Sequence, residues 1–162
     1  MLDSADVGLW YALYRLATNY WFDVDFNAGV TAHEFYVPGG VFAVGENRFE
    51  GPEQIRGYYT WRQRRGYTTS RHLLNNLQVI PADEDHVRQI GVLSLYRADG
   101  RPPFPAERPS MVIADIVADC VRGEDKVWRY QSHALWPLFV GRDIPPSISI
   151  DPHFLTKEQE RR

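Results

Sequence analysis

Hydrophobic residues recur at helical spacing in the first part of the chain. Between residues 3 and 29 apolar side chains fall every three or four positions, at Leu9, Leu13, Leu16, Ala17, Tyr20 and Val24. This spacing predicts a long amphipathic helix, with Asp3 or Ser4 as its N-cap and Asn27 and Gly29 at its end.

Two further helices and a hairpin are expected before residue 66. The pattern predicts a short helix over residues 31–36, which stops at the Pro-Gly-Gly of residues 38–40. Residues 41–51 alternate around a Gly-Glu-Asn turn, which is typical of a small hairpin. A third helix is predicted over residues 51–65, because Pro52 lies at a favoured first-turn position.

From residue 70 onward the pattern changes to the period of two that strands show. Four strands are predicted, over residues 71–80, 87–96, 110–121 and 127–138. Three helices followed by a long meander favour an α+β fold, with the helices packed on one face of a curved, mainly antiparallel sheet.

The length of 162 residues suits one domain. We expect that domain to span residues 1–140. Residues 141–162 carry three prolines and a charged end, and this composition predicts a partly flexible C-terminal extension.

Composition excludes several classes of function. The net charge of −3 leaves no basic patch for nucleic acid. No apolar run reaches the roughly 18 residues that a membrane span needs. The single cysteine, Cys120, forms no internal disulfide, and the N-terminus lacks the pattern of a signal peptide. These features favour a cytoplasmic protein.

The strand predicted over residues 71–80 mixes polar and apolar residues on one face. Simple alternation puts Leu73, Leu77 and Val79 on one side. His72, Leu74 and Asn76 fall on the other. That second face is either exposed to water or lines a cavity in which the imidazole and the carboxamide bind something. A lone strand histidine is more often structural than catalytic.

Asp25 is a candidate functional carboxylate at the end of the first helix. The neighbouring Tyr20, Trp21 and Phe22 are aromatic, and desolvation by such apolar surroundings raises the pKa of a carboxyl, as a base or a histidine-orienting group requires. A capping or surface role is the competing interpretation. Asp23 points elsewhere on the helix and is expected to be exposed.

The last predicted strand carries His133 in alternation with Arg129 and Gln131, opposite Trp128 and Tyr130. This polar face is either solvated or forms one wall of a pocket. The five histidines and the cysteine show no metal-binding spacing, and no glycine-rich phosphate loop is present. We therefore expect no metal and no nucleotide or flavin cofactor.

The layout and these residues together resemble the SnoaL-like branch of the nuclear transport factor 2-like superfamily. The resemblance covers residues 6–138. It rests on the first helix with Tyr20 and Asp25, on "NRFEGPEQIRGYY", on "RHLLNNLQV" and on "DKVWRYQSHAL". It implies a cone-shaped α+β barrel whose cavity lies between the helices and the sheet.

The resemblance also implies a mechanism. The sequence is similar to scytalone dehydratase, bile-acid 7α-dehydratase and hexachlorocyclohexane dehydrochlorinase, in which an aspartate orients a histidine that removes a proton from carbon. Asp25 and His72 match that pair. Tyr20 matches a pocket tyrosine of the bile-acid enzyme, and His133 falls where the dehydrochlorinase has an arginine. Asn76 and His133 are further candidates for substrate contact, and Tyr58 and Trp61 for an apolar wall.

The leading hypothesis is a cofactor-independent lyase of the dehydratase type, acting on a cyclic or aromatic, largely apolar small molecule. An isomerase or an aldol cyclase would use the same pair. A non-catalytic subunit, like the β subunit of a ring-hydroxylating dioxygenase, or a ligand-binding protein would share the fold. A homo-oligomer, dimer or trimer, is expected because the outer face of the sheet is apolar.

Overall fold

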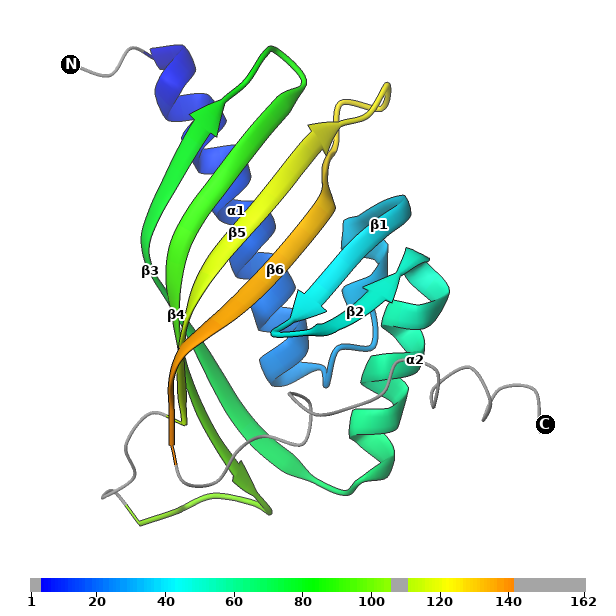
Figure 1. Ribbon diagram of the computed structural model, residues 1–162, viewed down its shortest axis with the longest axis vertical. Helices are drawn as coiled ribbons and strands as arrows, with labels where there is room; N and C mark the ends of the chain where they lie inside the picture. Colours follow the sequence, from blue (N-terminus) through cyan, green and yellow to red (C-terminus); the bar gives the residue numbers. More distant parts are fainter. Residues whose placement is uncertain (1–3, 106–110, 142–162) are drawn as a thin grey trace.

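The computed structural model describes residues 4–105 and 111–141 (Figure 1). Both long helices, the hairpin and all four long strands lie within a few residues of their predicted positions. The elements run in the order α1 Ser4–Phe26, the 3₁₀ turn η1 Ala32–Phe35, β1 Tyr36–Val44, β2 Asn47–Glu50, α2 Gly51–Arg64, β3 Thr68–Pro81, β4 His86–Asp99, β5 Val112–Arg122 and β6 Trp128–Val140.

The strands form one mixed sheet in the order β2-β1-β6-β5-β4-β3. Only the β1–β6 pair is parallel, so the α+β class with a mainly antiparallel sheet is confirmed. The sheet is open, with β2 and β3 as its two edges. One detail of the prediction was wrong. The second predicted helix is only the four-residue η1, and β1 continues through the Pro-Gly-Gly that was expected to separate elements.

Helix α1 lies across the concave face of the sheet, behind the long strands in Figure 1. Most of the predicted stripe is buried, with Leu13 and Tyr20 fully so, and Trp21 and Asp23 are buried beside it. The helix ends in a turn at Gly29, whose φ is +74°. A Cβ there would lie 2.2 Å from the Tyr59 ring, so the turn and α2 pack together only because the residue is glycine.

One β-bulge in β3 and one near the start of β6 change which residues face the core. In β3 the pairing with β4 shifts between Asn75 and Gln78, and Asn76 has a left-handed φ of 51°. In β6 the pairing with β5 skips Gln131. Each bulge inserts an extra residue, so the strand faces reverse beyond it.

The predicted alternation of these two strands was therefore wrong beyond the bulges. Val79 packs against the core rather than facing outward, and Asn76 is exposed rather than sharing the inner face with His72. In β6, Tyr130 and His133 are both buried, and Trp128 packs against the core. Single-period alternation has no means of predicting an inserted residue.

The outer face of the sheet remains apolar in composition. Its large exposed side chains include Leu73, Ile90, Trp136 and Phe139, each at least 40% exposed. Association through this face stays a prediction.

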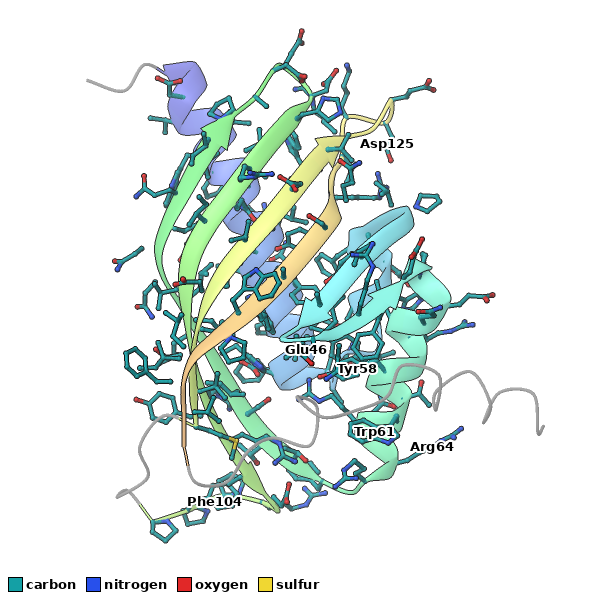
Figure 2. All side chains as sticks on the ribbon, in the orientation of Figure 1. Glu46, Tyr58, Trp61, Arg64, Phe104 and Asp125 are labelled. Atoms are coloured by element: carbon teal, nitrogen blue, oxygen red, sulfur yellow. The ribbon has the colours of Figure 1, made fainter. Side chains whose placement is uncertain are left out.

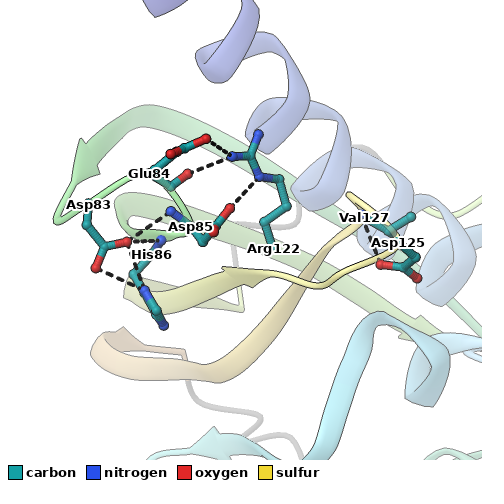
Figure 3. Close-up of polar contacts among 7 residues, drawn as sticks. All are labelled: Asp83, Glu84, Asp85, His86, Arg122, Asp125 and Val127. Atoms are coloured by element: carbon teal, nitrogen blue, oxygen red, sulfur yellow. Dashed lines mark hydrogen bonds and ion pairs between the residues drawn. The ribbon is translucent and has the colours of Figure 1, made fainter.

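Charged contacts hold the turn that connects β3 to β4 (Figure 3). The Asp83 carboxylate accepts hydrogen bonds from the backbone N–H groups of Asp85 and His86, and the His86 ring contacts it. Arg122 pairs with Asp85 at 2.7 Å and with Glu84 at 3.2 Å. These groups are largely exposed, so they organise the turns rather than form a site.

The predicted C-terminal extension, apart from its first residue, lies outside the described residues. Within the described part of the chain, no helix is long and apolar enough to cross a membrane.

Candidate active site

Asp25 and His72 are in direct contact. Asp25 is in the last turn of α1, and His72 is near the start of β3, on the face that packs against α1. The Asp25 Oδ1 atom lies 2.6 Å from His72 Nδ1, and Oδ2 accepts the His72 backbone N–H at 2.7 Å. Ser70 donates a third hydrogen bond to Oδ1 at 2.8 Å. The two side chains are each only 6% exposed.

These contacts determine the protonation of the imidazole. Burial raises the pKa of the Asp25 carboxyl, but the hydrogen bonds from His72 and Ser70 outweigh it and hold that pKa below its ordinary value. The raised pKa expected from the aromatic neighbours was therefore wrong. An ionised carboxylate only accepts hydrogen bonds, so His72 Nδ1 carries the proton. Burial also lowers the pKa of His72, against the opposing effect of Asp25. At neutral pH, His72 therefore has an unprotonated Nε2, which is the form that a general base needs.

His72 lines a cavity between the sheet and the two helices. Its ring stacks on that of Trp21, with the centroids 4.3 Å apart. The cavity walls are mainly apolar, and the cavity volume is about 50 Å³. Pockets for drug-sized ligands hold roughly 300–1,000 Å³. A cyclic ligand therefore has to displace wall side chains when it binds.

Two arginines of the cavity wall were missed by the sequence reasoning, Arg62 of α2 and Arg97 of β4. The Arg62 guanidinium lies over the rings of Tyr58 and Tyr59, 5.9 and 5.5 Å from their centroids. A signal for Arg62 was available, since it follows these tyrosines by four and three residues on one helix face. Arg97 pairs with β3 only in the folded sheet, opposite Ser70.

Tyr20 and His133 lie in an aromatic core and do not line the cavity. The Tyr20 hydroxyl is 2.5 Å from that of Tyr59, and His133 Nδ1 is 3.2 Å from the Tyr36 hydroxyl. Burial raises the tyrosine pKa values well above 10 and lowers the pKa of His133 to about 3. All of these groups are therefore neutral, and the structure brings neither predicted contact residue beside His72.

The remaining predicted residues are divided between the cavity and the surface. Tyr58 is buried and lines the cavity, as does Tyr59. Trp61 packs against the edge of the core, outside the cavity. Figure 2 shows Tyr58 and Trp61 at successive turns of α2. Asn76 is exposed at the bulge of β3 and is also outside the cavity.

Asp23 was expected on the surface, and this prediction was wrong. It is 6% exposed and holds the turn after α1. Its carboxylate accepts hydrogen bonds from Asn27 Nδ2 at 2.7 Å, from the Thr31 hydroxyl at 2.8 Å and from the Thr31 backbone N–H at 3.1 Å. Asp23 is thus a structural carboxylate two residues before Asp25.

In the part of the chain that the structure describes, no three His, Cys, Asp or Glu side chains cluster closely enough to hold a metal ion.

Several solved structures share this fold. A provisionally assigned scytalone dehydratase from Novosphingobium aromaticivorans is 12% identical with a TM-score of 0.75, and covers 89% of this chain and 93% of its own. A provisionally assigned aromatic ring hydroxylase from the same organism is 18% identical with a TM-score of 0.66, over 82% and 91%. ActVI-ORFA from Streptomyces coelicolor is 12% identical with a TM-score of 0.69, over 80% and 98%.

No protein-family profile and no curated protein matches the sequence. These structural likenesses, at 12–18% identity, confirm the expected fold. At these identities the activity does not follow from the fold.

Proposed function

We propose that the protein is a cofactor-independent lyase that removes water from a cyclic or aromatic small molecule, with His72 as the base. The observation that supports this most is the 2.6 Å contact between Asp25 and His72 beside the cavity. A neutral, oriented imidazole next to an apolar cavity suits proton abstraction from carbon. The likeness to a protein named for scytalone dehydratase is consistent with this chemistry.

The reaction would begin when His72 Nε2 takes a proton from the carbon next to a carbonyl group. The C–H electron pair then forms the enolate. When the carbonyl re-forms, a carbon–carbon double bond develops and the bond to the β-hydroxyl breaks. The imidazolium returns its proton to the departing hydroxyl, which leaves as water. Asp25 stays ionised throughout and stabilises the positive charge on His72.

The surroundings of His72 support this role. Trp21 restricts the imidazole ring from one face, and the hydrogen bond to Asp25 restricts its rotation. Because both side chains are almost completely buried, water competes little for Nε2. General base catalysis of this kind is worth roughly 10²–10⁴-fold in rate.

Two probe molecules separate proton abstraction from elimination. α-Tetralone has an acidic C2–H but no leaving group, so in D₂O it reports deuterium exchange by NMR. 3-Hydroxy-1-tetralone adds a β-hydroxyl, and loss of water gives 1-naphthol. We expect the wild type to catalyse both reactions and His72→Gln to lose them, with His86→Gln, in an exposed turn, as the matched control.

The proposal fails if exchange in the wild type is no faster than in His72→Gln. Exchange without formation of 1-naphthol from the second probe would instead indicate an isomerase or a cyclase, because these enzymes share the first step only.

A further inference from the structure

The charged side chains that line the cavity are all cationic. Arg62 comes from α2 and Arg97 from β4, and neither Asp nor Glu is among the lining residues. The carboxylate beside His72, Asp25, has both oxygens occupied by His72 and Ser70. A ligand in the cavity therefore meets cationic side chains among largely apolar walls.

The two arginines differ in what they contact. Arg97 Nη2 pairs with Asp99 at 2.7 Å, so its charge is partly compensated. The Arg62 guanidinium lies over the rings of Tyr58 and Tyr59, and none of the described carboxylates forms an ion pair with it. These cation–π contacts hold the guanidinium beside the cavity without using its N–H donors on an acid. Arg62 thus offers a planar cation on the wall of the same cavity as the proposed base.

We propose that the ligand of this cavity carries a permanently anionic oxygen, such as a carboxylate on an aromatic ring system, and that Arg62 binds it. This inference rests on the proposed function in so far as it concerns the same cavity, and it adds the charge of the substrate. A guanidinium binds a carboxylate through two parallel hydrogen bonds, which fixes the orientation as well as the position of the ring. The reacting carbon would then be presented to His72.

A negative substrate also changes the state of the base. The positive charge of Arg62 disfavours protonation of His72 and contributes to its lowered pKa. When an anion neutralises Arg62, that effect weakens, so His72 accepts a proton more readily once the substrate is bound.

Binding of 1-naphthoate and of its neutral isostere 1-naphthamide tests the inference without any turnover. By titration calorimetry in low salt, we expect the wild type to bind 1-naphthoate roughly tenfold or more tightly than 1-naphthamide. Arg62→Gln should lose about tenfold in affinity for 1-naphthoate and stay within about twofold for 1-naphthamide. Arg56→Gln is the matched control, because Arg56 is exposed on the same helix and does not line the cavity.

Two further measurements exclude a structural explanation. Arg62→Lys keeps the charge without the planar fork, so it should retain part of the preference for 1-naphthoate. In NMR titrations of His72, both Arg62→Gln and the binding of 1-naphthoate should raise the pKa of the imidazole. Loss of a merely structural arginine would not reproduce the effect of the ligand.

The inference is overturned if 1-naphthamide binds as tightly as 1-naphthoate, if Arg56→Gln weakens 1-naphthoate as much as Arg62→Gln does, or if 1-naphthoate does not bind at millimolar concentration. Its failure is distinct from failure of the lyase. A preference for 1-naphthoate without deuterium exchange would leave an anion-binding protein, and exchange without the preference would leave a base acting on neutral substrates.

Discussion

Two buried histidines on the inner face of one sheet differ in their hydrogen-bond partner and in whether they line the cavity. His72 and His133 both stack on an aromatic ring, Trp21 and Tyr130 respectively, and both have Nδ1 within hydrogen-bond distance of an oxygen. The partner of His72 is a carboxylate and that of His133 is the Tyr36 hydroxyl. Only His72 lines the cavity.

The difference teaches which features make a histidine a candidate base. Burial and stacking are common to both residues, so they carry no information about function. An ionised partner fixes the tautomer of His72 and compensates the imidazolium that forms during catalysis, whereas a phenol does neither as strongly. His133 is a core residue whose pKa of about 3 keeps it uncharged at any physiological pH.

The largest expected effect separates the two histidines by activity. His72→Gln should reduce deuterium exchange into α-tetralone roughly 10²–10⁴-fold. His133→Gln should change the rate per folded molecule only slightly, because His133 does not line the cavity. Exchange rates are normalised to the folded fraction from circular dichroism. An equal loss in both variants would show that the comparison is mistaken.

The second prediction concerns the stability in acid, to which His133 contributes most. The pKa of His133 is about 3 in the folded protein and about 6.5 when unfolded. The contribution of neutral His133 to the free energy of unfolding is therefore complete above pH 6.5 and is lost as the pH falls toward 3. At pH 3.5 the loss is about 4 kcal/mol. His72, whose pKa is also lowered by burial, acts in the same direction. Urea unfolding from pH 8 to pH 4 should show a shallower decline in His133→Gln, and parallel curves would contradict this.

The third prediction uses the two carboxylates at the end of α1. Asp25→Asn removes the charge that orients His72, so exchange should fall by about 10²-fold or more. Asp23→Asn should instead destabilise the fold by about 1–3 kcal/mol, because a buried acceptor of three hydrogen bonds is altered. Its rate per folded molecule should stay within about twofold. A loss of rate without loss of stability in Asp23→Asn would reverse the assignment.

The smallest expected effect concerns the pH dependence of the rate. Because burial lowers the pKa of His72, the rate of exchange should rise as the pH rises, with the midpoint of the rise below pH 6.5. At neutral pH the rate should have reached a plateau. Arg62→Gln should move that midpoint upward by a fraction of a pH unit. A midpoint above 6.5 in the wild type would indicate that another group, or an exposed imidazole, limits the reaction.

Several parts of the site were predictable from the sequence because they depend on local spacing. The stripe of α1 places Asp25 at a helix end, and the period of two places His72 on a strand face. The family resemblance paired them. Arg62 was also within reach, since its spacing from Tyr58 and Tyr59 is that of one helix face.

Other parts were not predictable, and each has a physical reason. The bulges in β3 and β6 insert residues that strand periodicity does not encode, so Asn76 was assigned to the wrong face. Asp23 depends on the turn that follows α1, whose hydrogen bonds come from residues four and eight positions later. Arg97 faces the cavity only because β4 pairs with β3 in one register.

The sequence by itself determined the elements, their order and the α+β class, because hydrophobic periodicity and turn residues act over short distances. Tertiary structure alone decided that His72, held by Asp25, lines one cavity with Arg62 while Tyr20 and His133 lie in the core. Contact across 47 residues, as between Asp25 and His72, depends on strand register and on how α1 crosses the sheet. Those are properties of the packed chain, and no local pattern specifies them.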